Sequence, residues 1–297
     1  MNIAIVGFGN VGRAAYEAVQ AADDMAVTCV VGSPRRQAPD YVKDIWVTGL
    51  ENIHAHGKVD CALLCLPTRA CPDAAATLLA MGVNTVDSYD IHESIWEVRC
   101  ALDGIAKQHG TCAVIAAGWD PGSDSVVRAL MQAIVPRGIT YTNFGPGMSM
   151  GHTVAAKAIP GVANALSVTL PTGAGVHRRM VYVELQAGAT LEQVTRDLKA
   201  DPYFANDDTR VTAVDDIAAL QDVGHGVHMT RKGASGAAHN QQLEFGMRIN
   251  NPALTSQIMA ACARACAKLP AGAYTMIEVP VAHLLPGTLE DNVRKLV

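Results

Sequence analysis

No apolar run in the 297-residue sequence reaches the roughly 18 residues that a membrane-spanning helix needs, and no basic tract stands out. The 23 basic and 28 acidic residues give a formal net charge of -5. The N-terminal segment also lacks a basic stretch followed by a long apolar one, which is the pattern of a secretory signal. We therefore expect a cytoplasmic protein that binds neither a membrane nor nucleic acid.

The sequence also lacks the spacings that hold metals or activate nucleophiles. It has eight cysteines but no C-x-x-C, and no His or Cys pair completes a zinc site with Cys262 and Cys266. It has neither a P-loop nor a nucleophile elbow. Several cysteines lie in apolar runs, namely Cys29, Cys61, Cys65 and Cys112. We predict reduced cysteines that pack in a core, and no metal.

What the sequence does have is a glycine motif at its start. Residues 3–6 form an apolar run short enough to be a buried strand, and Gly7, Gly9 and Gly12 follow it as G-x-G-x-x-G. A helical pattern runs from 11 to about 21. Gly7 permits a tight turn, Gly9 lets a pyrophosphate approach the backbone, and Gly12 lets the helix pack on the strand. We predict dinucleotide binding at a helix N-terminus. The alternative is a glycine-rich turn in another α/β protein.

The first 120 residues or so alternate between apolar strand patterns and helical patterns. Strands are expected at 27–31, 61–66, 84–86 and 112–116, and helices at 73–81 and 91–109. This alternation predicts a Rossmann-like, doubly wound parallel sheet with helices on both faces. The loops that follow the strands, at 32–36, 66–69, 87–90 and 117–120, are expected to converge on a cofactor crevice.

The pattern changes after residue 120, where a helix is expected to run to about 134 and a Gly-rich loop spans 143–152. Apolar residues then alternate with polar ones at 165–170, 180–186, 209–214 and 242–249. Alternation of this kind predicts a second, α+β domain over 121–251 with a mainly antiparallel sheet. Asn251 and Pro252 then begin a helix that ends near 268.

No acidic residue stands at the end of the second strand, where an NAD site usually has one. That loop carries Ser33, Arg35 and Arg36 instead. The planar fork of an arginine suits a 2′-phosphate, so the sequence favours NADP. The alternative is that both arginines belong to a solvated loop.

Five further side chains are candidates for chemistry. Asp90 and Asp120 each lie just beyond a strand end, where a carboxylate holds an ammonium or moves a proton, although each is also a plausible cap. Arg179 lies on an alternating strand and suits carboxylate capture, although an exposed strand arginine is the commoner case. His225 lies between two glycines, while His152 reads as a structural histidine that bonds backbone.

Eight segments together resemble the NADP-dependent meso-diaminopimelate D-dehydrogenase family over nearly the whole chain. They are residues 6–13, 85–92, 117–122, 144–152, 159–161, 222–226, 248–252 and 274–278. The combination of 118–122 (Gly-Trp-Asp-Pro-Gly) with 143–152 is the most specific part. The glycine motif alone does not separate this family from other reductases.

The resemblance implies a reversible reaction. The family oxidises the D-centre of meso-2,6-diaminopimelate with NADP⁺ to L-2-amino-6-oxopimelate, which cyclises to tetrahydrodipicolinate, and releases ammonia and NADPH. This is a step of lysine biosynthesis. The resemblance further implies a homodimer, an open-to-closed domain motion, and a C-terminal segment, 252–297, that packs back on the nucleotide domain 1–120.

The resemblance also assigns residues. Asp90 and Asp120 match the acids beside the reacting D-centre. The other substrate contacts implied are Trp119, Phe144, Met150, Gly151, Thr169, Arg179, His225 and Asn251, of which Thr169, Arg179, His225 and Asn251 grip the distal L-amino acid end. The cofactor contacts expected from the glycine motif, the second-strand loop and the resemblance are Gly7, Phe8, Gly9, Asn10, Val11, Gly12, Ser33, Arg35, Arg36, Leu66, Pro67, Thr68, Arg69, Ser88, Tyr89 and Asp90.

The connection between Thr169 and Arg179 is short, as in the subgroup of the family with relaxed scope. This suggests reductive amination of simple 2-oxo acids with ammonia to D-amino acids. The rival hypotheses are a dihydrodipicolinate reductase, which would lack the 118–122 block, and a sugar oxidoreductase, whose E-K-P motif is absent here. A catalytically silent NADP sensor would have lost Asp90, Asp120 or Arg179, and all three are present.

Overall fold

The computed structural model describes residues 1–220 and 224–297, which divide into two compact units. The first comprises Met1–Ala129 and Pro252–Val297, and the second comprises Leu130–Asn251. The first change of unit falls inside helix α4 (Ser123–Ile134) and not at the expected residue 120. Within the described residues, no helix is both long and apolar enough to cross a membrane.

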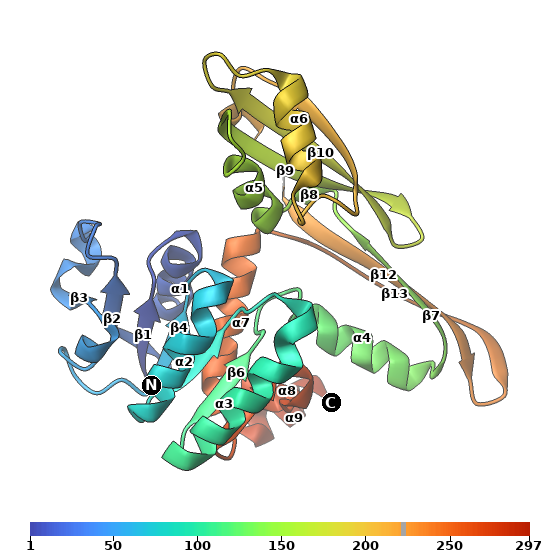
Figure 1. The fold of residues 1–297 in the computed structure, drawn as a ribbon. Coiled ribbons are helices and arrows are strands. Elements are labelled where there is room, and N and C mark those ends of the chain that lie inside the picture. Colours follow the sequence, from blue (N-terminus) through green and yellow to red (C-terminus); the bar gives the residue numbers. More distant parts are fainter. Residues whose placement is uncertain (221–223) are drawn as a thin grey trace. The chain divides into compact units, whose positions relative to one another are not determined.

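The first unit is built on a seven-stranded parallel sheet in the order β14-β6-β5-β4-β1-β2-β3 (Figure 1). Its strands are β1 (Asn2–Val6), β2 (Ala26–Gly32), β3 (Trp46–Thr48), β4 (Cys61–Leu64), β5 (Asn84–Asp87), β6 (Cys112–Ile115) and β14 (Gly272–Thr275). Both faces of the sheet are covered, which explains why the central strands read as continuous apolar runs. The predicted strand at 61–66 ends earlier, at Leu64.

Successive residues of β1 point to opposite faces and pack against different helices. Ile3 and Ile5 share a core with α1 (Asn10–Gln20) and α7 (Asn251–Cys266). Ala4 and Val6 share the other core with α2 (Cys71–Ala80) and α3 (Ile95–His109). The predicted doubly wound Rossmann-like fold is therefore confirmed. Helix α3 starts later than expected, after a 3₁₀ turn at His92–Ser94.

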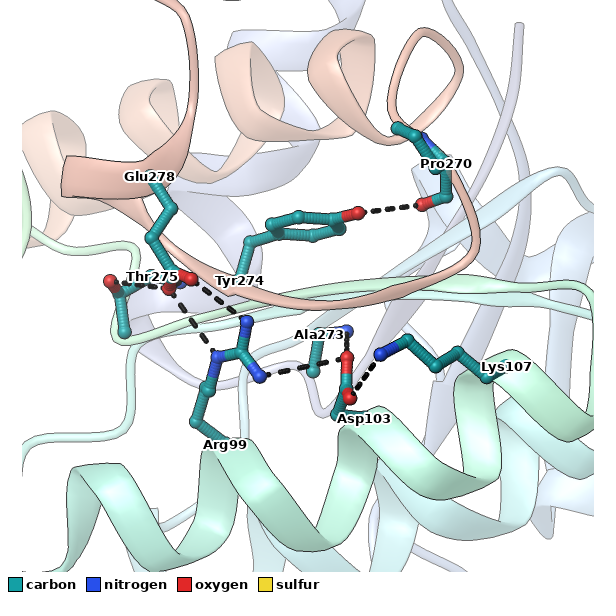
Figure 2. A network of polar contacts seen from close by, with 8 residues as sticks. All are labelled: Arg99, Asp103, Lys107, Pro270, Ala273, Tyr274, Thr275 and Glu278. Atoms are coloured by element: carbon teal, nitrogen blue, oxygen red, sulfur yellow. Dashed lines mark hydrogen bonds and ion pairs between the residues drawn. The ribbon is translucent and has the colours of Figure 1, made fainter.

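The C-terminal segment belongs to the first unit and completes its sheet, because β14 pairs in parallel with β6. Figure 2 shows how polar contacts fasten this segment to α3. Arg99 Nη2 donates to Glu278 Oε1 at 2.8 Å, and the Ala273 amide donates to Asp103 Oδ1 at 3.1 Å. The 3₁₀ turn Met276–Glu278 and helices α8 (Val281–Leu284) and α9 (Leu289–Leu296) follow.

The second unit contains two sheets. One has the order β11-β10-β9-β8, from β8 (Gly147–Met148), β9 (Val162–Gly173), β10 (Val176–Leu185) and β11 (Asp208–Ala213). The other has the order β13-β12-β7, from β7 (Arg137–Phe144), β12 (His225–Ser235) and β13 (Ala238–Ile249). Among the described strands of this second unit, only the β10–β11 pairing is parallel, so the mainly antiparallel prediction is confirmed.

Helices α5 (Met150–Lys157) and α6 (Leu191–Ala200) pack on one face of the four-stranded sheet through Ala156, Val194 and Leu198. The segment 143–152, predicted as a loop, holds the end of β7, all of β8 and the start of α5. Its glycines had suggested irregular backbone, but Gly147 stands in β8 opposite Thr169. This pairing brings the segment to the strand that carries the predicted distal site.

Candidate active site

The glycine motif forms the turn from β1 into α1. Gly7 has φ +91°, and a Cβ there would lie 2.4 Å from the Cys65 carbonyl oxygen. A Cβ on Gly12 would lie 2.1 Å from the Gly7 carbonyl oxygen. By contrast, a Cβ on Gly9 would meet nothing within 4 Å. The first and third glycines are therefore needed by the fold, while the second leaves the backbone open to a ligand.

Gly9 is also the N-cap of α1, and the first turn of that helix carries no acidic residue. The N–H groups at a helix N-terminus and the helix dipole favour an anion. A phosphate beside Gly9, Asn10 and Val11 fits this turn both sterically and electrostatically.

A pocket of about 300 Å³ lies against the same turn. Of the predicted cofactor residues, the pocket is lined by Gly7, Phe8, Ser33, Arg36 and Leu66. Arg35 does not line it, and its amide donates to Ser33 Oγ at 3.3 Å. The structure thus separates the two arginines, since only Arg36 borders the cavity.

Trp46 also lines this pocket, and its ring requires glycine at the end of β2. A Cβ on Gly32 would lie 1.7 Å from the ring of Trp46. Trp46 also packs edge-to-face on Phe8, with ring centroids 5.8 Å apart. NAD enzymes often carry an acid at the end of the second strand. Here Gly32 and Ser33 stand there, and both line the pocket together with Trp46.

Two further predicted loops are tied together beyond β4 and β5. The Asp90 amide donates to Thr68 Oγ1 at 3.1 Å, which joins the loop holding Pro67, Thr68 and Arg69 to the loop holding Ser88, Tyr89 and Asp90. Asp87 secures the second loop, because its Oδ1 accepts the amides of Tyr89 at 2.9 Å and Ala116 at 3.2 Å. Burial raises the pKa of Asp87 to about 6 in spite of these donors. The sequence reasoning missed Asp87, although an acid at a strand end was a usable signal.

Asp120 lies in a tight turn that leads into α4, next to Trp119, which is almost completely buried. Its carboxyl lies within hydrogen-bonding reach of the carboxyl of Asp124, which is fully buried in the first turn of α4. Burial raises the pKa of Asp120, and the nearby carboxyl of Asp90 adds to the rise. The structure therefore brings Asp90 and Asp120 into electrostatic reach of each other and adds Asp124, which the sequence reasoning missed.

Of the predicted distal residues, Thr169 and His225 lie near Arg179 in the second unit. Thr169 on β9 and Arg179 on β10 are cross-strand partners, and the guanidinium donates to Thr169 Oγ1. Arg179 Nε also donates to Asp207 Oδ2 at 2.6 Å. The Arg179 side chain is only 16% exposed, and its charge is paired there with the carboxylate of Asp207.

Two histidines surround this guanidinium. His225 is buried, and its Nδ1 accepts the Gly226 amide at 2.7 Å. Burial lowers the pKa of His225, and the charges of Arg179 and His177 lower it further. His177 Nε2 accepts the Phe144 amide at 2.7 Å, and the two rings lie 5.4 Å apart. The cluster thus combines one arginine with neutral imidazoles, and His177 is a member that the sequence reasoning missed.

Met150 and Gly151 are the first residues of α5, and His152 follows them. His152 Nδ1 lies 2.9 Å from Ser149 Oγ, and Nε2 lies 3.6 Å from Asp207 Oδ2. Burial lowers the pKa of His152 to about 4, and its ring also bonds the Tyr203 backbone. Asp207 therefore serves both Arg179 and His152.

Asn251 and the motif 222–226 are the last parts of the predicted distal site. Asn251 is the last residue of the second unit and begins α7. Of the motif 222–226, residues Asp222 and Val223 lie outside the described residues. In the part of the chain that the structure describes, no group of three or more His, Cys, Asp or Glu side chains could hold a metal ion.

A doubly wound parallel sheet with a phosphate-binding turn, joined to an α+β unit with a charged cluster, defines the class of protein: a Rossmann-type oxidoreductase. The meso-diaminopimelate D-dehydrogenase of Bacteroides fragilis is 54% identical over 295 residues, which cover 99% of this chain and 98% of that protein. The chain belongs to the meso-diaminopimelate D-dehydrogenase family.

Family models and solved structures agree with this membership. The diaminopimelic acid dehydrogenase C-terminal domain matches residues 118–176, and the CoA binding domain matches residues 1–88. The DAP dehydrogenase of C. glutamicum in complex with DAP is 29% identical, with a TM-score of 0.90 over 100% of this chain and 99% of that one. An engineered D-amino acid dehydrogenase bound to NADP⁺ is 28% identical, with a TM-score of 0.86 over 100% and 99% of the two chains.

Proposed function

We propose that this protein oxidises the D-centre of meso-2,6-diaminopimelate to L-2-amino-6-oxopimelate, with release of ammonia and NADPH, and that it also catalyses the reverse amination. The observation that carries the proposal is the charge pattern of the two clusters. Asp90 and Asp120 suit the ammonium of the D-centre, and Arg179 with Thr169 suits the distal carboxylate. The relative in C. glutamicum is described in complex with DAP, which supports this assignment.

The cofactor is NADP. Ser33 and Arg36 at the 300 Å³ pocket would hold the 2′-phosphate, and the open backbone at Gly9 would hold the pyrophosphate. When bound, NADP⁺ supplies the two-electron oxidation of the α-carbon. A solved structure that is 28% identical to this chain, an engineered D-amino acid dehydrogenase, is described as bound to NADP⁺.

The carboxylates of this chain move protons around that oxidation. The D-ammonium must lose a proton before its α-carbon is oxidised, because only the free amine donates its lone pair to the developing imine. Asp120 accepts that proton. Asp90 and Asp120 then orient a water that adds to the imine carbon, and ammonia leaves. The resemblance to the family further implies that Trp119, Phe144 and the backbone of Met150 and Gly151 contact the D-centre end of the substrate.

The cluster of Thr169, Arg179 and Asp207, here called the distal grip, also supports activity on a broader range of substrates. The strands that carry Thr169 and Arg179 turn tightly, since β9 ends at Gly173 and β10 begins at Val176. Asp207 already neutralises Arg179, so a 2-oxo acid without a distal carboxylate leaves no unpaired buried charge. We expect pyruvate or phenylpyruvate, with ammonia and NADPH, to give D-amino acids. Failure with every simple 2-oxo acid would contradict this broader scope.

Absorbance at 340 nm tests the main proposal directly. The protein is incubated with NADP⁺ or NAD⁺ and with each stereoisomer of diaminopimelate. We expect NADPH formation with the meso isomer and NADP⁺. Equal activity with the L,L isomer, which lacks a D-centre, would overturn the assignment.

Arg36 is predicted to select NADP over NAD. Replacing Arg36 with alanine should raise KM for NADP⁺ by about tenfold or more and leave KM for NAD⁺ nearly unchanged, because a charge-assisted bond to phosphate contributes about 1.5–3 kcal/mol. Arg35→Ala is the matched control, since Arg35 does not border the pocket. Initial rates with both cofactors measure the effect, and equal losses in the two variants would count against the assignment to Arg36.

A homodimer in the cytoplasm completes the proposal. Strand β13 has no buried residue, yet its alternate side chains include Leu243, Phe245, Met247 and Ile249, which are only partly buried in this chain. A sheet face of this kind suits burial against a second copy. We expect light scattering to give about twice the chain mass of 31.2 kDa. The free cysteines, most of them buried, are in keeping with a reducing compartment.

A further inference from the structure

Behind Asp120 lies a second carboxyl that the proposed reaction does not use. Asp124 follows one helical turn later and is 0% exposed. Arg128 Nη2 donates to Asp124 Oδ2 at 2.8 Å, and Ser125 Oγ donates to Asp124 Oδ1 at 3.3 Å. The carboxyls of Asp120 and Asp124 also lie within hydrogen-bonding reach of each other.

Two ionised carboxylates cannot hydrogen-bond to each other, because each of them only accepts. A bond between them therefore requires one proton shared by the pair. Burial and the charge of Asp120 raise the pKa of Asp124 to about 7, while Arg128 opposes the rise. The charge of Asp90 also raises the pKa of Asp120. The pair therefore still holds its shared proton at pH values close to neutral.

We propose that Asp124 is a positioning residue of the reaction, which shares one proton with Asp120 and thereby orients the Asp120 carboxylate and sets its affinity for the proton of the D-ammonium. The proposal rests on the proposed function of Asp120. With the shared proton on Asp124, its O–H donates to one oxygen of Asp120, and the other oxygen is left to accept from the amine. The N–H bond of the ammonium breaks and an O–H bond forms on Asp120. The proton later passes to water, which restores the singly protonated pair.

The pH dependence of kcat/KM for meso-diaminopimelate tests this role with Asp124→Asn and Asp124→Ala. The asparagine keeps a permanent donor beside Asp120 and removes the like charge, so the acidic limb of the profile should move to lower pH by about one unit or more. Alanine loses the donor, and its kcat should fall by about tenfold or more, with asparagine restoring most of it. Asp23→Asn, at an exposed site, is the control and should keep the wild-type profile.

A second measurement does not depend on turnover. An acid whose pKa is raised in the folded state binds more protons there than in the unfolded chain, so its titration lowers stability as pH rises. For Asp124 the pH window runs from its ordinary pKa of 3.8 to its raised pKa of about 7. The Tm of Asp124→Asn minus that of the wild type should therefore increase between pH 4 and pH 7, and Asp120→Asn should show the same trend.

The possible outcomes distinguish a failure of the proposed reaction from a failure of the proposed role of Asp124. An inactive wild type with the expected Tm trend would reject the proposed reaction and retain the proton-sharing pair. An active wild type whose pH profile is unchanged in Asp124→Asn would overturn the role of Asp124. Parallel Tm curves for the wild type and both asparagine variants would overturn the shared proton itself.

Discussion

Replacing Asp120 with asparagine is expected to lower kcat for oxidation of meso-diaminopimelate by about 10²–10⁴-fold, which corresponds to the loss of a general base. The asparagine keeps the size of the side chain and its bond to Asp124 but accepts no proton. NADPH binding depends on the turn at Gly9 and on Arg36, so its Kd should change less than about twofold. Steady-state rates and NADPH fluorescence titration give the two quantities.

Asp120→Asn is expected to remain folded, so its lower kcat would not come from unfolding. The variant removes a buried carboxyl whose pKa is raised, so its stability above pH 7 should equal or exceed that of the wild type. Asp23→Asn, an exposed acid in the same unit, is the control for a change of charge alone. Turnover of Asp120→Asn within a factor of about three of the wild type would remove the proposed role.

The sequence predicted the first unit well, because its strands are buried on both faces and therefore read as short apolar runs between turn residues. Two strands of the same sheet were missed. Trp46–Thr48 is three residues long. Gly272–Thr275 is set by its pairing with β6 and by the bonds that its amides donate to Asp103 and Glu278. Neither strand carries a local signal of its own.

The strands of the second unit were harder to predict from the sequence, because polar residues lie on them. Strand β12 contains Arg231, which is buried and donates to the carbonyl of Val135 at 2.7 Å and to Thr140 Oγ1 at 2.8 Å. These bonds satisfy a charge that the alternation of apolar and polar residues would place in solvent. Local patterns cannot reveal such a long-range partner.

Residues of the site also differ in whether a local pattern in the sequence could reveal them. Asp124 was within reach of sequence reasoning, since it lies four residues after Asp120 on a predicted helix, although an acid in the first turn also fits a helix start. Asp207 was not. It reaches Arg179 across 28 residues because β11 pairs in parallel with β10, with Arg179 opposite Thr209. Only the fold makes Asp207 part of the distal cluster.

Replacing Arg179 with methionine is expected to lower kcat/KM for meso-diaminopimelate by about 10²–10³-fold, because truncating one partner of a buried, bonded charge pair costs about 2–5 kcal/mol. The loss should appear mainly in the meso substrate, whose distal carboxylate needs the guanidinium beside Thr169. Amination of pyruvate, which has no distal carboxylate, should change far less. Parallel kinetics with the two substrates measure this difference.

The adjacent Arg178 supplies a matched control on the same strand. Arg178 Nε bonds Asp208 Oδ2 at 2.6 Å, but that carboxylate is 54% exposed, so Arg178→Met should leave both activities close to the wild type. Arg179→Met also leaves Asp207 without its guanidinium partner, and the double variant Arg179→Met with Asp207→Asn removes that unpaired charge. If the double variant regains stability and pyruvate amination but not activity on the meso substrate, Arg179 recognises the distal carboxylate. If it regains activity on both substrates, the loss came from the buried Asp207 charge, and the distal grip lies elsewhere in the cluster.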